Sequence, residues 1–424
     1  MQNRRDFLRT AAAAALAAGT FPHLQAAPKS ARRKRIAMLI TEVRKMSHGQ
    51  HFLDRFLDGY GWQGAHHHPD VDVAALYIDQ HPENDLSLDR SRRFNVPIYP
   101  TIEEALNCGG KKLAVDGVVI IAEHGKYPRN EKGQTLYPRY KFFKATTDVF
   151  KASERSVPVF NDKHLSTDWK ECLEMVELSK KLKFPFLAGS SLPVTWRMPS
   201  IDMPYGAKLA QSVCICYGGV DSYDFHGLET AQCMSERRAG GETGVKTAHA
   251  LRGEAVWDRL EQDEQTRRLF LAALSRSETR RPPEGYTFAP PTLDLARKQA
   301  RDPVGYFYEH NDGFHTAMFL MNGLVSDFTY AGLHRDTGAI TSCIMFLPMP
   351  SAIATTANFF NPLVHHIEQT VLRNRVPYPI ERTLLTSGMT LFAVESLRRG
   401  QIKIETPEMN VPYRAPKEST FWRS

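Results

Sequence analysis

One segment, residues 157–192, constrains the fold of this chain more than any other. Residues 157–160 and 186–189 are short apolar runs, as expected of buried strands. Between them, Asp168 and Glu171 have capping-box spacing, and apolar residues then follow near a helical period. A strand, a helix and a second strand in this order form the unit of an open α/β sheet, in which ligands bind just beyond the carboxyl ends of the strands.

The turn after the first of these strands is polar at four successive positions, Asn161, Asp162, Lys163 and His164. Because it follows the carboxyl end of a predicted strand, this turn is where a reacting group would lie, and Lys163 is the candidate. The alternative interpretation is a lysine at a surface strand end that takes no part in chemistry.

The N-terminal half repeats the same alternation of strands and helices. Strands are predicted at residues 35–40, 71–78 and 116–122, and helices at residues 49–57 and 102–106. The pattern predicts a Rossmann-like, doubly wound parallel sheet over residues 31–192. Two acidic residues directly follow strands of this sheet, Asp79 and Glu123.

Residues 193–424 have the pattern of a second α/β domain. Strands are predicted at residues 213–217, 246–251 and 341–347, an apolar stretch with strand-like parts at 314–330, and helices at 362–374 and 380–397. Residues 259–302 are charged and contain prolines, so we expect helical insertions and loops there. The mixture predicts an open sheet with helices on one face.

A second cluster of reactive side chains lies in this domain, around His226 and Glu229. A histidine near a helix start is well suited to accept a proton from a hydroxyl group near neutral pH. The alternative is a histidine that only caps the helix.

These segments together resemble the Gfo/Idh/MocA family, named after glucose–fructose oxidoreductase and inositol dehydrogenase. The turn Asp162-Lys163-His164 and the helix after it are similar to the family's Glu-Lys-Pro turn and its helix. The stretches at residues 93–106 and 400–413 also resemble family segments. His226 and Glu229 match part of the family pattern D-x-x-x-H-x-x-D, although Ser222 stands where its first aspartate is expected.

The resemblance implies hydride transfer between a sugar or polyol carbon and the nicotinamide ring of a tightly held NAD or NADP. It implies that Lys163 orients and polarises the reacting hydroxyl and that His226 moves its proton. An acid at the position of Asp79 bonds the ribose hydroxyls in NAD-binding relatives. The cofactor-binding residues that we predict are Ser47, Gly49, Asp79, Glu123 and Asp162.

The first turn of the predicted dinucleotide fold departs from the family. Such a fold needs G-x-G-x-x-G so that the backbone can approach the pyrophosphate, and only Gly49 remains in residues 41–51. Glu42 would repel a phosphate, whereas Arg44 and Ser47 could attract one. Either the nucleotide is held differently, or the chain is a non-redox carbohydrate-binding protein that has lost nucleotide binding on the same fold.

A polar loop, residues 123–140, follows the third strand and contains three tyrosines, Tyr127, Tyr137 and Tyr140. They suit contacts with a sugar, and the alternative is a mobile surface loop.

Residues 1–30 are predicted to be a twin-arginine signal peptide, with Arg4-Arg5 followed by a short alanine-rich run at residues 11–18. That run is too short to span a bilayer, so we expect no stable membrane insertion after cleavage. The pathway exports folded proteins, which fits a periplasmic protein that takes up its cofactor before export.

The net charge of +7 comes partly from the signal and from the basic cluster at residues 32–35, and no basic patch interleaved with aromatic residues indicates nucleic acid. The six cysteines lack zinc-type spacing and are expected to be buried thiols. Adjacent histidines in a loop rarely converge on one ion, so no metal site is predicted at residues 66–68. The oligomeric state stays open, and a homo-oligomer is compatible with the sequence.

Overall fold

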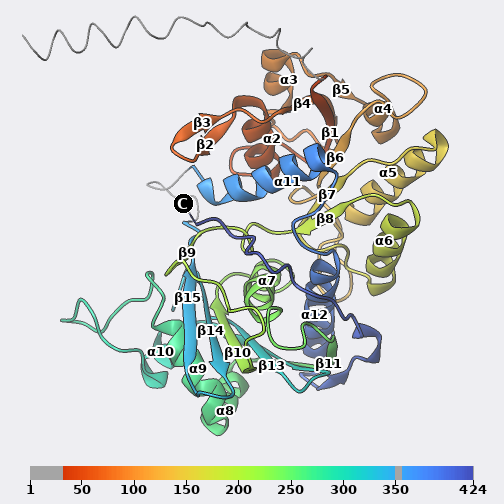
Figure 1. Cartoon of the computed structure of the whole chain (residues 1–424). Helices are drawn as coiled ribbons and strands as arrows, with labels where there is room; N and C mark the ends of the chain where they lie inside the picture. The colour runs from red at the N-terminus through yellow and green to blue at the C-terminus, as the bar shows by residue number, and fades with distance from the viewer. Residues whose placement is uncertain (1–31, 349–355, 424) are drawn as a thin grey trace, which may run out of the picture. The chain divides into compact units, whose positions relative to one another are not determined.

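A computed structural model describes residues 32–348 and 356–423, so the predicted signal peptide lies outside the described residues. Figure 1 shows two sheets, each covered by helices. The first sheet has six strands in the order β5-β4-β1-β6-β7-β8. Its strands are β1 (Lys34–Ile40), β4 (Val71–Ile78), β5 (Ile98–Tyr99), β6 (Gly117–Ile121), β7 (Val159–Asp162) and β8 (Phe186–Gly189). All neighbouring pairs are parallel, so the Rossmann-like prediction is confirmed.

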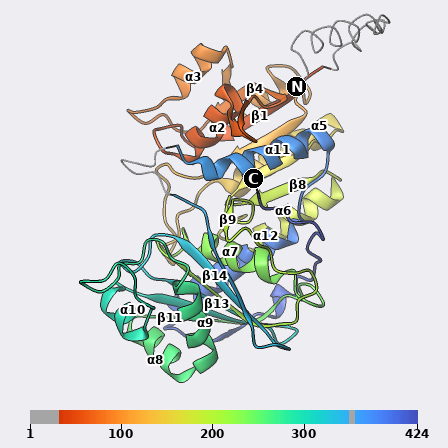
Figure 2. The same ribbon diagram turned by 60° about the vertical axis from the view of Figure 1, so that its left-hand side comes forward.

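Helices cover both faces of this sheet. They are α2 (His48–Asp58), α3 (Ser87–Phe94), α4 (Ile102–Asn107), α5 (Arg139–Ser153) and α6 (Trp169–Lys181). A sixth helix, α11 (Asn361–Arg373), comes from the C-terminal part of the chain and lies beside α2 in both ribbon views (Figures 1 and 2). A small hairpin of β2 (Tyr60–Trp62) and β3 (Ala65–His67) follows α2 and contacts α11.

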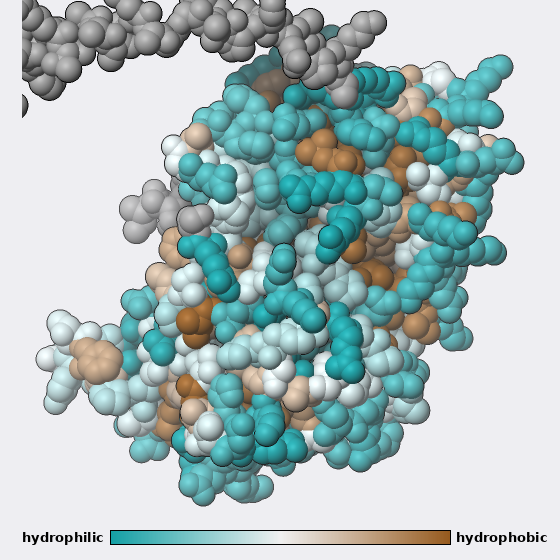
Figure 3. All heavy atoms as spheres, viewed as in Figure 1, coloured by the Kyte–Doolittle hydropathy of each residue, from teal (hydrophilic) through white to brown (hydrophobic). Residues whose placement is uncertain are grey.

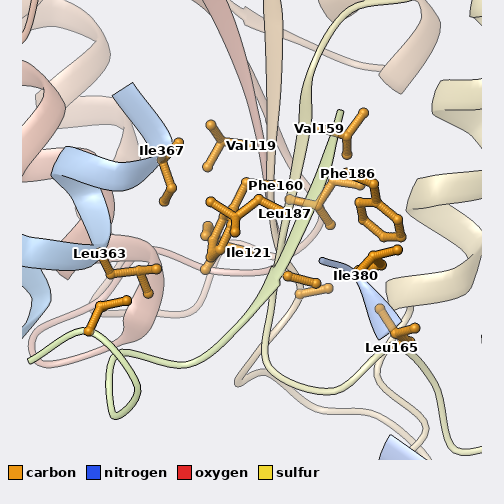
Figure 4. Packing of buried hydrophobic residues seen from close by; sticks show 14 of the residues in the cluster. Val119, Ile121, Val159, Phe160, Leu165, Phe186, Leu187, Leu363, Ile367 and Ile380 are labelled. Atoms are coloured by element: carbon orange, nitrogen blue, oxygen red, sulfur yellow. The ribbon is translucent and has the colours of Figure 1, made fainter. Parts of the chain in front are cut away.

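The core of the first sheet explains why its strands are continuous apolar runs. β6 is buried at all five positions, because helices exclude water from both faces of a parallel sheet. Figure 4 shows Val119 and Ile121 of β6 in the same cluster as Leu363 and Ile367 of α11. The first sheet therefore completes its core with residues that lie more than 200 positions later in the chain than β6.

The second sheet is mixed and has the order β16-β11-β12-β13-β10-β14-β15-β9. Its strands are β9 (Arg197–Met198), β10 (Leu209–Cys216), β11 (Val245–Arg252), β12 (Val304–His310), β13 (His315–Leu320), β14 (Phe328–His334), β15 (Ile340–Met345) and β16 (Ile404–Glu405). Only β10 and β13 pair in parallel. The apolar stretch predicted at residues 314–330 contains two strands, β13 and β14, with a turn between them.

Helices cover both faces of the second sheet, so the expectation of helices on one face was wrong. The helices α7 (Asp224–Ser235) and α12 (Glu381–Arg398) pack together against one face, and α8 (Glu254–Gln262) and α9 (Glu264–Leu274) form a separate core on the other. Along β10 the side chains alternate between these cores, because successive strand residues point to opposite faces. Cys214 and Cys216 belong to the first core and Val213 and Ile215 to the second, and the cysteines are free thiols.

The remaining elements are the helix α10 (Leu293–Gln299) and two single 3-10 turns, η1 (Asn358–Phe360) and η2 (Pro407–Met409). On the face seen in Figure 3, polar side chains dominate and apolar residues form small scattered groups. Among the described residues, no helix combines the length and the apolar character that crossing a membrane requires.

Candidate active site

A cavity of about 210 Å³ lies where β6, β7 and β8 of the first sheet end and α7 of the second domain begins. Of the residues predicted from the sequence, Glu123, Asp162, Lys163 and His226 line this cavity. Ser47, Gly49 and Asp79 do not line it. The structure therefore brings the predicted catalytic residues Lys163 and His226 together in one cavity. Of the predicted cofactor residues, Glu123 and Asp162 line this cavity, and the other three lie outside its lining.

Lys163 stands directly after β7 in an uncommon backbone conformation, with φ of 70°. Its backbone N–H donates to the carbonyl of Gly189 at 3.1 Å, which ties the turn to the end of β8. A residue with a side chain in the left-handed region costs free energy, and such residues cluster at functional sites. The side chain is only 3% exposed, and Nζ donates to Nε2 of His226 at 2.6 Å.

His226 lies in the first turn of α7, a helix whose residues are all buried. The carboxylate of Asp224 fixes this turn, because it accepts from the backbone N–H groups of Asp221, Ser222 and Phe225. Burial and the charge of Lys163 hold the pKa of His226 well below its usual range. The imidazole is therefore neutral at physiological pH, and its Nε2 can accept a proton.

Glu123 neutralises the positive charges beside His226. Its carboxylate accepts from the buried Arg139 at 2.5 Å and lies 3.7 Å from Nζ of Lys163. Burial would raise the pKa of Glu123, but Lys163 and Arg139 outweigh burial and hold that pKa well below its usual range. The glutamate is therefore ionised at neutral pH, and its negative charge lies beside the side chains of Lys163 and Arg139.

The structure adds a pair that the sequence analysis missed. Nδ1 of His48, the first residue of α2, donates to Oδ2 of Asp162 at 2.6 Å, and both residues line the cavity. A carboxylate in this position holds the imidazole of His48 in one orientation toward the cavity. The sequence predicted no role for His48. Its place directly after Ser47, which caps α2 in the structure, is the one signal that could have drawn attention to it.

Ser47 and Gly49 have structural roles in the first turn. Ser47 caps α2, and its hydroxyl accepts from the backbone N–H groups of Arg44 and Gln50, both at 3.1 Å. At Gly49, a Cβ atom would lie 2.4 Å from the carbonyl oxygen of Glu42 and 2.6 Å from the side chain of Ile40. The glycine is therefore required for the close approach of α2 to β1, which is one of the roles of glycine in dinucleotide folds.

Asp79 follows β4 as expected, but both of its carboxylate oxygens are already bonded. They accept from the hydroxyls of Tyr77 and Tyr127, each at 2.6 Å. Tyr137 lines the cavity, whereas the hydroxyl of Tyr140 donates to Glu174. The residues that line the cavity could hold the reacting end of a dinucleotide, whereas Asp79, if it faced the adenosine ribose, would offer a carboxylate that two tyrosines already occupy.

The parallel Rossmann-like sheet and the separate mixed sheet, with helices on both sides, match the Gfo/Idh/MocA fold. No family model matches the chain, and no curated protein matches its sequence. Its likeness is to solved structures at low sequence identity.

This chain aligns with nearly the whole length of three of these structures. GenD2 from gentamicin A biosynthesis, solved in complex with NAD, is 11% identical over 91% of this chain and 99% of its own, with a TM-score of 0.53. Myo-inositol dehydrogenase from Lactobacillus casei, in complex with NAD(H) and myo-inositol, is 12% identical over 88% and 96%, with a TM-score of 0.53. Scyllo-inositol dehydrogenase from the same organism is 10% identical over 88% and 98%, with a TM-score of 0.51. This likeness establishes the fold.

Proposed function

We propose that this chain is an oxidoreductase that transfers a hydride between NAD or NADP and a hydroxyl-bearing carbon of a sugar or polyol. The observation that carries the proposal is the contact of Lys163 with His226 in a cavity at the carboxyl ends of the strands. GenD2 in complex with NAD and the inositol dehydrogenase in complex with NAD(H) and myo-inositol support it, because the chain shares their fold.

In the proposed mechanism, the reacting hydroxyl enters the cavity beside the Lys163–His226 pair, within reach of both Nζ and Nε2, and replaces their direct hydrogen bond. The ammonium of Lys163 donates to the substrate oxygen and stabilises the negative charge that develops there. The neutral His226 accepts the hydroxyl proton on Nε2. A bound nicotinamide ring would supply the acceptor for the hydride of the same carbon, while Lys163 and His226 hold the oxygen on that carbon. In the direction of reduction, His226 returns the proton to the carbonyl oxygen.

The size of the cavity favours a small substrate. Its volume of about 210 Å³ lies below the range of about 300–1,000 Å³ that is usual for small-molecule pockets. Polar groups such as His48 and Ser190 line it beside the catalytic pair. A single sugar ring or a cyclic polyol matches these properties better than an oligosaccharide.

The residues that would hold the nucleotide are Asp79, Glu123 and Asp162, together with the first turn of α2. Asp79 could accept the ribose hydroxyls only after the hydroxyl of Tyr127 leaves its carboxylate. This same bond favours a second candidate, a carbohydrate-binding protein that no longer holds a nucleotide. In that case the Lys163–His226 pair would bind a sugar hydroxyl without oxidising it.

Export through the twin-arginine pathway to the periplasm is also part of the proposal, on the strength of Arg4-Arg5 and the short apolar run after them. Replacing both arginines with lysine should leave the precursor in the cytoplasm. An unchanged periplasmic yield would contradict it.

The two candidates differ in one assay. The purified chain is incubated with NAD or NADP and a panel of sugars and cyclic polyols, and the near-ultraviolet absorbance of the reduced nicotinamide is followed. The oxidoreductase proposal expects reduction by the wild type and a loss of about 10²–10⁴-fold in Lys163→Met. Calorimetric binding of a sugar or polyol by a chain that binds no nicotinamide would favour the second candidate.

A further inference from the structure

Two histidines and a buried glutamate meet on the first domain, outside the cavity. The ligand atoms of His67, His365 and Glu368 all lie within 4.8 Å of one another. We propose that these three residues bind a divalent transition-metal ion, with zinc as the probe ion, and that the ion fastens the β2–β3 hairpin to α11.

The distances bracket those of a zinc site. Nε2 of His67 is 2.7 Å and Nδ1 of His365 is 3.8 Å from the same oxygen, Oε2 of Glu368. Zinc bonds of about 2.0–2.2 Å in tetrahedral geometry place neighbouring ligand atoms about 3.3 Å apart. The two distances to Glu368 would each change by about half an ångström, and the two histidine nitrogens, which lie within 4.8 Å of each other, would move together by at most about 1.5 Å.

The glutamate is already oriented from outside the cluster. Its other oxygen, Oε1, accepts from the backbone N–H of Asp70 at 2.7 Å. Outer hydrogen bonds of this kind hold a metal-binding carboxylate in place. Glu368 is 0% exposed, and a buried carboxylate needs a positive partner or several hydrogen bonds. A divalent cation would balance this negative charge more fully than the hydrogen bond between His67 and Glu368 does.

The ring of His365 is also held in position. It stacks on Trp62 of the hairpin, with centroids 4.6 Å apart and an interplanar angle of 27°. Its Nδ1 is shielded from solvent and has no hydrogen-bond partner among the described residues, although it lies toward Glu368. A shielded imidazole nitrogen beside a carboxylate is ready to accept a metal.

The positions of the three ligands along the chain explain why the adjacent histidines at residues 66–68 did not by themselves predict a metal site. On β3, His66 turns away and bonds the carbonyl of Asp58, so only His67 reaches the cluster. The other two ligands are three positions apart on α11, where positions i and i+3 share a helix face. They lie about 300 residues beyond His67.

The site keeps an open position. The side chains of His67 and His365 are 25% and 24% exposed, so an ion can enter past the exposed ring edges, although Nδ1 of His365 itself is shielded. Three protein ligands with an open position are typical of two-histidine, one-carboxylate zinc sites. The rival interpretation is a simple hydrogen bond from His67 to Glu368 with His365 as a packing residue.

The test measures metal content and zinc affinity of the full chain, purified without chelators. We expect about one zinc per chain, or binding of one added Zn²⁺ in competition with a chromogenic chelator. His365→Gln and His67→Gln should each weaken this binding by more than about 100-fold, since even outer-sphere partners are worth 10–100-fold. His68→Gln is the matched control, because His68 is exposed and adjacent to His67.

A thermal melt with and without Zn²⁺ separates binding from folding. Zinc should raise the melting temperature of the wild type and of His68→Gln and should leave that of His365→Gln unchanged. No bound zinc and no zinc-dependent shift in the wild type would overturn the proposal. Equal zinc affinity in His365→Gln and the wild type would also overturn it, because the ion would then lie elsewhere.

Discussion

Nζ of Lys163 and Nε2 of His226 lie 2.6 Å apart, although 63 positions separate them and they belong to different sheets of the fold. Lys163 follows β7 of the first sheet, and His226 lies on α7, which packs on the second. The contact between Lys163 and His226, which we propose to be catalytic, therefore forms only when both halves of the chain are folded against each other.

The first prediction concerns this pair. Lys163→Met and His226→Ala should each lower kcat for hydride transfer by about 10²–10⁴-fold, the usual contribution of a proton-transfer group. Both side chains are buried, so steady-state kinetics is read beside a thermal melt. A variant that keeps wild-type kcat would remove that residue from the mechanism, and His226→Gln serves as the near-isosteric control.

The second prediction concerns the nucleotide and the two tyrosines on Asp79. Tyr127→Phe removes one hydroxyl that Asp79 now accepts and should strengthen NAD binding, because the carboxylate becomes free for the ribose. Asp79→Ala should weaken NAD binding by about 1–3 kcal/mol, the scale of a hydrogen bond to a charged group. Titration calorimetry checks both. Equal affinities in the two variants would mean that Asp79 does not contact the nucleotide.

The third prediction concerns the packing of α2 on β1. Gly49→Ala places a methyl group against the backbone of Glu42 and the side chain of Ile40. We expect a loss of about 1–3 kcal/mol in the free energy of unfolding, the usual cost of overpacking, with or without NAD. Denaturant unfolding measures this loss. A variant as stable as the wild type would show that the helix can move away at little cost.

The fourth prediction concerns pH and Asp221. Burial, and then the charge of Asp224, raise the pKa of Asp221 from 3.8 to about 7. Because the folded chain holds this proton more tightly than the unfolded chain, its contribution to stability is present at low pH and is lost as the pH rises from about 4 to 7.

Asp221→Asn should remove this loss while keeping an oxygen that accepts from Gln134. Between about pH 5 and pH 8, the wild type should therefore lose at least about 1 kcal/mol of stability relative to the variant. Urea unfolding at the two pH values gives the difference. If the difference in the free energy of unfolding between the wild type and Asp221→Asn were the same at both pH values, the raised pKa of Asp221 would be contradicted.

The sequence predicted the parts of the fold that depend on local pattern. The apolar runs at residues 157–160 and 186–189 predicted β7 and β8 of the first sheet, because strands that are buried on both faces are apolar at successive positions. Lys163 was found because it follows such a strand, and the carboxyl ends of parallel strands converge. His226 was found by its place near a helix start.

Contacts between distant segments were not visible in the sequence. His48 meets Asp162 across 114 positions, and Arg139 reaches Glu123 from a helix that the sequence analysis treated as the end of a loop. The return of α11 to the first sheet depends on tertiary packing of Leu363 and Ile367, which an amphipathic pattern alone cannot direct to a particular partner. The bonds of Asp79 with Tyr77 and Tyr127 likewise depend on a loop conformation that no local pattern fixes.

The most direct test of the proposed function is the search for the cofactor itself. The chain is purified folded and then denatured, and the released small molecules are analysed by absorbance and mass. Protein that carries none is titrated with NAD and NADP up to about 1 mM, the upper end of usual KM values. The account predicts about one nicotinamide nucleotide per chain, either released or bound in the titration. A folded chain that neither releases nor binds a nicotinamide nucleotide would contradict it.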